Sequence, residues 1–117
     1  MNALELTLPW PPSNNTYYRN AGAKTLISAK GREYAHAVGY QVLMQRGAKH
    51  LQCRLNVHLD VYPPNRARRD LDNLFKAVLD SLTKSGVWVD DSQIDALSIA
   101  RRSVGGMVKV RITEASC

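Results

Sequence analysis

The stretch that decides the fold is Leu51-Gln52-Cys53-Arg54-Leu55-Asn56-Val57-His58-Leu59-Asp60-Val61-Tyr62, in which apolar and polar residues alternate throughout. Successive side chains of a β-strand point to opposite faces of its sheet, so this alternation predicts a long strand with one apolar face. Pro63 and Pro64 follow it, and proline has no N–H to donate to a ladder of hydrogen bonds. We therefore expect the strand to end at Tyr62.

A helix is predicted after these prolines, over residues 72–84. Its apolar residues recur three and four positions apart, which is the spacing of one face of an α-helix. Ser85-Gly86 provides the end, because glycine adopts the left-handed conformation that closes a helix. The apolar face predicts a helix that lies on a core, and it consists of Leu71, Leu74, Phe75, Val78, Leu79 and Leu82.

The residues before this strand predict a strand, a loop and a second helix. Residues 3–8 alternate as a strand, and three closely spaced prolines predict a loop over residues 9–15. Residues 20–27 are expected to form a loop or a short hairpin. Ser28 is a suitable N-cap for a helix over roughly residues 29–46.

The C-terminal part predicts two more strands, over residues 94–103 and 107–113, joined by a turn at Gly105-Gly106. The resulting order of strands and helices predicts an α+β fold, in which a mixed β-sheet carries two main helices. The length of 117 residues fits one small domain over residues 1–117.

Composition narrows the function further. Lys and Arg number 16 against 10 Asp and Glu, so the net charge of +6 suggests a polyanionic partner, nucleic acid first. The sequence contains no run of about 18 apolar residues, which is the length that would predict a membrane span. Cys53 and Cys117 are too few for a disulfide framework, and we expect a core thiol and a loose terminal thiol in a reducing, cytoplasmic compartment.

The segment most informative about chemistry is Arg66-Ala67-Arg68-Arg69-Asp70-Leu71-Asp72-Asn73-Leu74-Phe75-Lys76. In a helix, Asp70 and Asp72 would point roughly 160° apart, so their carboxylates converge only if the backbone between them is extended. Regular helix should then start at or after Asp72. The alternative is that one of these aspartates only caps the helix.

Two further features favour a metal site. Asp90-Asp91 follows the helix at the end of a short apolar segment, and carboxylates from two separate elements suit Mg²⁺. Lys76 lies one helical turn after Asp72, where it could also form an ordinary surface ion pair. Carboxylates with a divalent metal beside guanidinium groups predict a site that cleaves phosphodiesters.

Three segments together resemble the motifs of RusA-type Holliday-junction resolvases. The first is Leu8-Pro9-Trp10-Pro11-Pro12-Ser13-Asn14-Asn15-Thr16-Tyr17-Tyr18-Arg19, and the second is the segment from Arg66 to Lys76. The third is Leu82-Thr83-Lys84-Ser85-Gly86-Val87-Trp88-Val89-Asp90-Asp91. The resemblance extends over nearly the whole chain, although residues 29–52 carry little of it.

The resemblance implies a specific site and partner. The family's acidic triad falls on Asp70, Asp72 and Asp91, as catalytic residues and metal ligands, and its catalytic lysine falls on Lys76. It implies a homodimer, with the acids near the dimer interface, that makes paired symmetric nicks in four-way DNA junctions with Mg²⁺, for which Mn²⁺ could substitute. It also implies a bacterial or phage-encoded, nucleoid-associated enzyme of DNA recombination and repair, with no membrane and no small-molecule cofactor.

We expect DNA contacts at basic and amide side chains outside the triad. Phosphate contacts are expected first from the arginines before Asp70, and further contacts from residues nearer the N-terminus. The complete set is Arg66, Arg68, Arg69, Asn14, Asn15, Lys24, Lys30 and Arg32.

Other polar and aromatic residues have simpler interpretations. Trp10 and Tyr17 could stack on exposed bases, although core packing is favoured for Trp10. We expect His58 to be solvated, with Asp60 beside it as a candidate support for the catalytic loop. Asp80 and Asp95 are predicted to be surface residues.

Two alternatives keep parts of this pattern. A DNA-binding module without catalysis would keep the basic surface and use the acids as caps and ion pairs. A metal-dependent nuclease or phosphatase would keep the acids and act on RNA, flaps or nucleotides instead of junctions.

Overall fold

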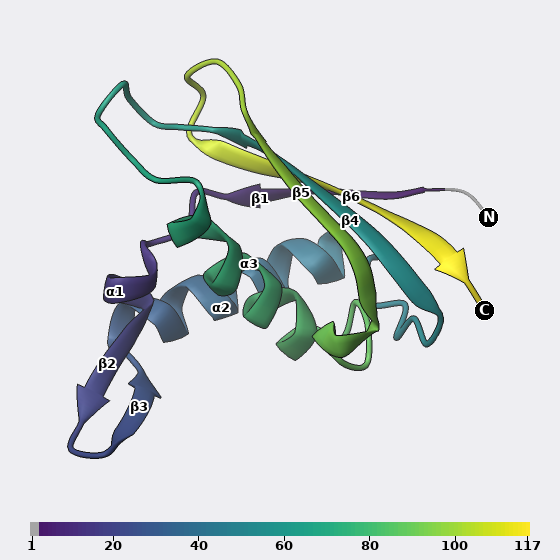
Figure 1. Ribbon diagram of the computed structural model, residues 1–117, viewed down its shortest axis with the longest axis horizontal. Helices are drawn as coiled ribbons and strands as arrows, with labels where there is room; N and C mark the ends of the chain where they lie inside the picture. The colour runs from purple at the N-terminus through teal and green to yellow at the C-terminus, as the bar shows by residue number, and fades with distance from the viewer. Residues whose placement is uncertain (1–2) are drawn as a thin grey trace.

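The computed structural model describes residues 3–117, and a four-stranded mixed sheet forms its centre (Figure 1). The strand order is β1-β6-β4-β5, in which β4 pairs with β5 in parallel and with β6 antiparallel. The strands are β1 (Leu4–Pro9), β4 (Arg54–Tyr62), β5 (Ile94–Arg101) and β6 (Met107–Ser116). The predicted central strand is therefore confirmed, although it begins at Arg54 rather than Leu51.

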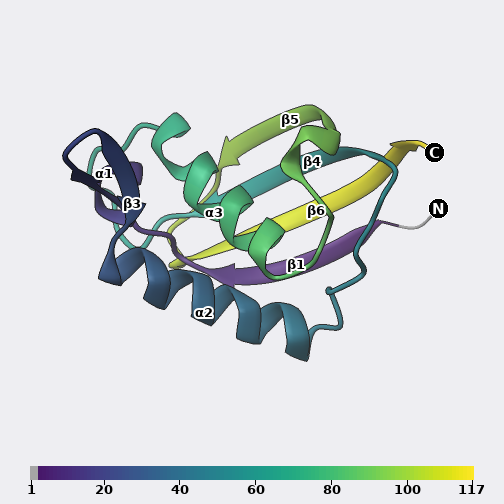
Figure 2. The same ribbon diagram turned by 90° about the horizontal axis from the view of Figure 1, so that it is seen from below.

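Two helices cover one face of this sheet, as Figure 2 shows from below. They are α2 (Ala29–Met44) and α3 (Asp72–Lys84), so the predicted α+β fold with two main helices is confirmed. Ser28 caps α2 by accepting a hydrogen bond from the backbone N–H of Gly31, as expected. Gly86, at φ +82°, follows the last turn of α3 as the predicted terminator.

The core lies between the sheet and the helices. Alternate residues of the strands point into it, because one face of the sheet is covered and the other is open. Trp88 is 1% exposed and belongs to this core. The buried strand and α3 residues include Leu6, Leu8, Leu55, Val57, Leu59, Val61, Val108, Val110, Ile112, Leu74, Val78 and Leu82.

The last two strands are joined by a turn, as predicted, but they do not pair with each other. Gly105-Gly106 does reverse the chain, with Gly106 at φ +82°, but β4 lies between β5 and β6. Turn residues such as Gly105-Gly106 indicate where the chain reverses direction. They do not indicate which strand lies beside which in the sheet. The almost uninterrupted apolar face of β4 is best buried when both of its edges are paired, whereas the largely exposed β5 forms the edge of the sheet.

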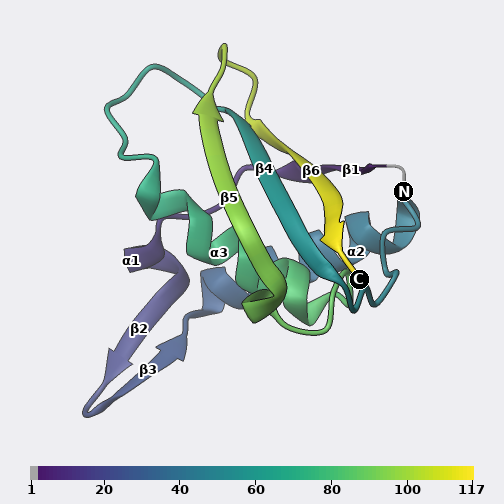
Figure 3. The same cartoon turned by 45° about the vertical axis from the view of Figure 1, so that its right-hand side comes forward.

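The N-terminal loop leads into a small projecting unit (Figure 3). A single helical turn, α1 (Asn14–Tyr17), interrupts the predicted loop, and a hairpin of β2 (Tyr18–Ala21) and β3 (Lys24–Ile27) follows. The short hairpin expected around residues 20–27 is thus confirmed. The carbonyl of Tyr17 approaches α2 closely at Gly31, where any side chain would collide with it.

The two cysteines form a disulfide between Cys53 and Cys117, so the expectation of two free thiols is wrong. The cause is the antiparallel pairing of β4 with β6, which sets Arg54 opposite Ser116 and brings the adjacent cysteines together. The sequence could not show this pairing, because no local pattern states which strands lie side by side. Over residues 3–117, neither long helix has the length and apolar character needed to cross a membrane.

Candidate active site

The start of α3 presents two exposed carboxylates. Asp72 is the first residue of the helix, as expected, and Leu71 takes the N-cap position without a side-chain hydrogen bond. Neither Asp70 nor Asp72 therefore occupies the N-cap position of α3, although Asp72 lies in its first turn, where a carboxylate favours the helix dipole. The backbone at Leu71 is helical, at φ −63° and ψ −37°, so the extended link expected between the two aspartates is absent from this described segment.

The structure distinguishes Asp91 from Asp90, which local sequence could not do. Asp90 caps a short 3-10 helix, η1 (Asp91–Gln93), by accepting a hydrogen bond from the N–H of Ser92 at 3.1 Å. Gln93 completes this capping box, since its side-chain oxygen accepts the N–H of Asp90 at 2.8 Å. The hydrogen bonds from Ser92 lower the pKa of Asp90. Asp91 is exposed and takes no part in the capping box.

The three triad carboxylates are chemically available but lie apart in one chain. None of them accepts a side-chain hydrogen bond or ion pair from residues 3–117, so their oxygens are free for a ligand. Asp72 begins α3, whereas η1 follows the other end of that helix (Figure 1). The charge of Asp91 acts on Asp80, which lies eight residues, or about 12 Å, along the helix from Asp72.

The described residues contain one compact group of three metal-ligating types, and it is not the triad. Cys53, Glu114 and Cys117 lie within 4.8 Å of one another. Both sulfur atoms are in the disulfide, so no thiolate is available there to bind a metal.

Lys76 lies on the exposed side of α3, one turn from Asp72. Its ammonium is 4.6 Å from the ring centroid of Tyr18 and 3.8 Å from a carboxylate oxygen of Asp80. A cavity of about 510 Å³ opens beside it, lined by Asn14, Asn15, Tyr18, Arg19, Asn20, Thr25 and Lys76. The structure thus brings the two predicted asparagines to the lysine and adds Arg19, which sequence reasoning missed.

Asn14 carries an unsatisfied polar atom at this cavity. Its side-chain oxygen is buried and has no hydrogen-bond partner among the described residues. A buried acceptor without a protein partner is costly, and a bound water is its usual partner.

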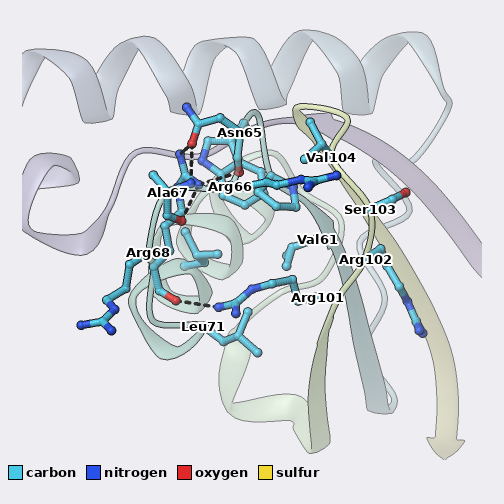
Figure 4. Close-up of a pocket in the computed structure, with 14 residues that line it drawn as sticks. Val61, Asn65, Arg66, Ala67, Arg68, Leu71, Arg101, Arg102, Ser103 and Val104 are labelled. Carbon is cyan, nitrogen blue, oxygen red and sulfur yellow. Dashed lines mark hydrogen bonds between the residues drawn. The ribbon is translucent and has the colours of Figure 1, made fainter.

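An arginine-rich cavity of about 330 Å³ lies between the loop before α3 and the end of β5 (Figure 4). Its apolar wall includes Trp10 and Leu74, and its cationic residues are Arg66, Arg68, Arg69, Arg101 and Arg102. Arg68 and Arg102 extend away from the cavity on opposite sides. This combination suits an anionic ligand with a phosphate group.

Arg69 is held in place within this cavity. Its guanidinium lies 5.6 Å from the ring centroid of Trp10 and donates to the backbone oxygen of Asn65 at 3.1 Å and to its side-chain oxygen at 2.8 Å. These contacts order the loop through which Arg66 and Arg68 are presented to solvent. Arg69 therefore has a structural part as well as a charge.

Sequence reasoning missed Arg101 and Arg102. They line the cavity because β4 and β5 are parallel, with Val61 opposite Arg101, and so both strands leave the sheet at the same edge. A prediction that β4 and β5 pair in parallel, connected through α3, would have indicated the position of these two arginines.

Known proteins similar in sequence share one description. The family model described as Endodeoxyribonuclease RusA matches residues 9–113. Crossover junction endodeoxyribonuclease RusA of Escherichia coli strain K12 is 40% identical over 116 residues, 97% of each chain. The protein of the same name from Enterobacteria phage 82 is 41% identical over 116 residues, again 97% of each chain.

The chain belongs to the RusA family. The RusA match contains every residue placed in the candidate site, from Trp10 to Arg102, whereas Cys117 lies beyond it. One of the two cysteines of the disulfide therefore lies outside the region that matches the family.

Three predicted DNA contacts do not line either of the two cationic cavities. Lys24 begins β3, and Lys30 is exposed on α2. Arg32 donates to the backbone oxygen of Ile27 at 3.0 Å and lines a different cavity, with His36, Lys84 and Ser85. The structure does not gather these residues with Lys76 or with the arginine loop.

Several other predictions for the RusA chain need correction. Tyr17 is completely buried and hydrogen-bonded to Ser81 at 3.2 Å, so it cannot stack on a base, and burial raises its pKa. His58 is not merely solvated, because it bonds Ser98 at 2.6 Å and Asp60 at 2.9 Å. Asp60 also accepts a hydrogen bond from Arg102 at 2.7 Å, which links it to the arginine cavity.

The prediction of two surface aspartates is half right. Asp95 is exposed and pairs with Arg54 at 2.5 Å. Asp80 is half-buried instead, with 28% of its side chain exposed. Burial and the negative charge of Asp91 raise the pKa of Asp80, and Lys84 opposes them.

Proposed function

We propose that this chain is a metal-dependent endodeoxyribonuclease that resolves four-way DNA junctions by paired symmetric nicks. The observation that carries the proposal is the set of free, exposed carboxylates at the two ends of α3, of which Asp70 lines a cavity with Arg68 and Arg69. Family membership supports the reaction class, since the named relatives are crossover junction endodeoxyribonucleases.

The residues present fit a hard divalent cation in their chemistry. Asp70, Asp72 and Asp91 offer oxygen ligands without competing partners among residues 3–117, which is what Mg²⁺ requires, and Mn²⁺ would accept the same ligands. When bound, such an ion lowers the pKa of a coordinated water and offsets the charge on the scissile phosphate. The three aspartates would hold it.

The separation of the triad along α3 supports a homodimer. If the ligand set is built from two copies, an aspartate at the start of α3 in one chain would meet Asp91 of its partner. A twofold dimer would then present two equivalent sites, which matches two strands of one junction. Paired symmetric nicks follow from that symmetry.

The remaining side chains would bind and orient the DNA. The Lys76 ammonium, at the mouth of its cavity with Asn14 and Asn15, would stabilise negative charge on the reacting phosphate. Arg66 and Arg68 would contact neighbouring phosphates, and the net charge of +6 makes affinity fall steeply with salt. We place the activity in DNA recombination and repair in the cytoplasm of bacteria, or on phage DNA.

The test uses a synthetic four-way junction, labelled on each strand in turn, with linear duplex, flap and RNA controls. Wild type and Asp72→Asn are compared with and without Mg²⁺. We expect ligatable, symmetric nicks in the junction only, dependent on Mg²⁺ and lost in Asp72→Asn, which still shifts the junction in a gel. Tight binding without nicks in any divalent metal would indicate a binding module. Equal cleavage of the controls would indicate a different nuclease.

A further inference from the structure

A charged stripe runs along the exposed side of α3. Asp72, Lys76 and Asp80 are spaced four residues apart, and each step rises about 6 Å while turning only about 40° around the helix axis. The stripe therefore leads from the carboxylates at the start of α3 towards the end of the helix that η1 follows. Asp80 is the member of the stripe that has no role in the predicted motifs or in the proposed mechanism.

Asp80 joins the hairpin to the lysine. One oxygen of its carboxylate accepts a hydrogen bond from the hydroxyl of Tyr18 and lies 3.8 Å from the ammonium of Lys76. The ring of Tyr18 is itself 4.6 Å from that ammonium. These three side chains form a closed triangle, in which the lysine is in contact with a carboxylate on one side and with an aromatic ring on another.

We propose that Asp80 is a positioning residue that holds the ammonium of Lys76 at the mouth of its cavity, a proposal that rests on the proposed function. The Lys76 side chain is 59% exposed, and a free lysine of this kind samples many rotamers. Fixing its charge before the phosphate arrives removes that reorganisation from the reaction. Tyr18 orients the carboxylate and limits the lysine's range.

The surroundings of Asp80 argue against a role in stability alone. Burial and the charge of Asp91 both disfavour its ionised form, and the charge of Lys84 offsets them only in part, so that the pKa stays raised. A neutral amide of the same shape would accept the hydrogen bond from Tyr18 equally well and would avoid this cost. The carboxylate charge therefore needs another explanation, and the nearby ammonium supplies one.

The experiment compares Asp80→Asn with wild type, because asparagine keeps the acceptor for Tyr18 and removes the charge. Single-turnover cleavage of a four-way junction, junction affinity in Ca²⁺ and the melting temperature are measured for each. We expect cleavage to slow by between about tenfold and a hundredfold, with affinity and melting temperature near wild type. Asp95→Asn, which removes an exposed carboxylate from β5, serves as the matched control and should cleave normally.

A double-mutant cycle with Lys76→Ala tests whether Asp80 acts through the lysine. We expect Asp80→Asn to add little to the loss already caused by Lys76→Ala. The same fold-loss in both backgrounds, a lowered melting temperature that accounts for the loss, or no loss at all would overturn the proposal.

A second readout does not depend on cleavage. In NMR spectra of the free protein, the two ε-methylene protons of Lys76 should be distinct in wild type and should converge in Asp80→Asn. If wild type leaves junctions uncut, the proposed function fails, and these spectra still show whether Asp80 holds the lysine. Unchanged Lys76 signals in Asp80→Asn would overturn the positioning role, whatever the cleavage assay shows.

Discussion

The guanidinium of Arg101 donates a hydrogen bond to the backbone oxygen of Arg69 at 2.6 Å, and this bond ties the end of β5 to the loop before α3. The two residues are 32 positions apart and meet because β4 and β5 run in parallel. Arg69 in turn lies over Trp10. One contact thus connects the edge strand, the arginine loop and the N-terminal segment.

Loss of this tie should weaken DNA binding. A bond from a charged donor at an exposed position is worth about 1 kcal/mol, so Arg101→Ala should reduce junction affinity about fivefold. Hydrogen exchange over residues 65–70 should rise at the same time. Arg54→Ala removes an equal charge from a strand far from the loop and is the control. Equal affinity losses in the two variants would mean that only charge matters.

Asp90 and Asp91 should behave differently, although they are neighbours. Asp91→Asn removes a proposed metal ligand, so nicking should fall by at least about a hundredfold, comparable to the loss of other preorganised charges at active sites. Asp90→Asn weakens the cap of η1 and should lower the melting temperature slightly, with nicking largely kept. The measurement is junction cleavage beside thermal melting of both variants. If Asp90→Asn were inactive but normally stable, Asp90 rather than Asp91 would be the metal ligand.

Mixed dimers should reveal whether the site is shared between copies. If Asp72 of one chain works with Asp91 of its partner, a dimer of one Asp72→Asn chain and one Asp91→Asn chain contains one intact site. Such heterodimers, isolated with two affinity tags, should nick only one strand of each bound junction. Each homodimeric variant should be inactive. Heterodimers that stay inactive would place the three carboxylates of each site within one chain.

Asp60 should contribute to the pH dependence of stability. Burial raises its pKa, but hydrogen bonds from His58 and Arg102 outweigh burial and leave the pKa lowered. A carboxylate with a lowered pKa in the folded state stabilises the protein above its unfolded pKa of about 3.9 and loses this contribution as pH falls further. Melting curves of wild type and Asp60→Asn should therefore differ near neutral pH and converge below about pH 4. A constant difference across that range would contradict this assignment.

The disulfide should be a main source of stability. Closing a loop over the 64 positions between Cys53 and Cys117 should stabilise the fold by about 4 kcal/mol through the unfolded chain. Urea titrations with and without dithiothreitol measure this difference. Cys53→Ser should be as unstable as the reduced protein and should not respond to the reductant. A reduced protein as stable as the oxidised one would show that strand pairing alone holds the C-terminus.

The sequence was sufficient for elements whose pattern is local. The alternation from Arg54 to Tyr62 and the apolar face of α3 each depend on near neighbours, and both predictions are confirmed. The asparagines of α1 were also recognised as candidates, and the structure places them beside Lys76.

What the sequence could not provide depends on pairing between distant strands. The positions of Arg101 and Cys117 both follow from the neighbours of β4, and no local pattern states those neighbours. The half-buried state of Asp80 follows from the docking of the hairpin through Tyr18. The roles of the triad residues stay predictions that cleavage assays must test.

The Cys53–Cys117 bond makes a covalent ring of everything from the start of β4 to the C-terminus. The arginine loop, α3 and η1 all belong to this ring, while β1, the hairpin and α2 form a linear tail attached to it. A protease that cuts the exposed loop between Asn65 and Asp70 would open the ring without releasing either fragment. The nicked protein would migrate as one piece until it was reduced, and only then as two.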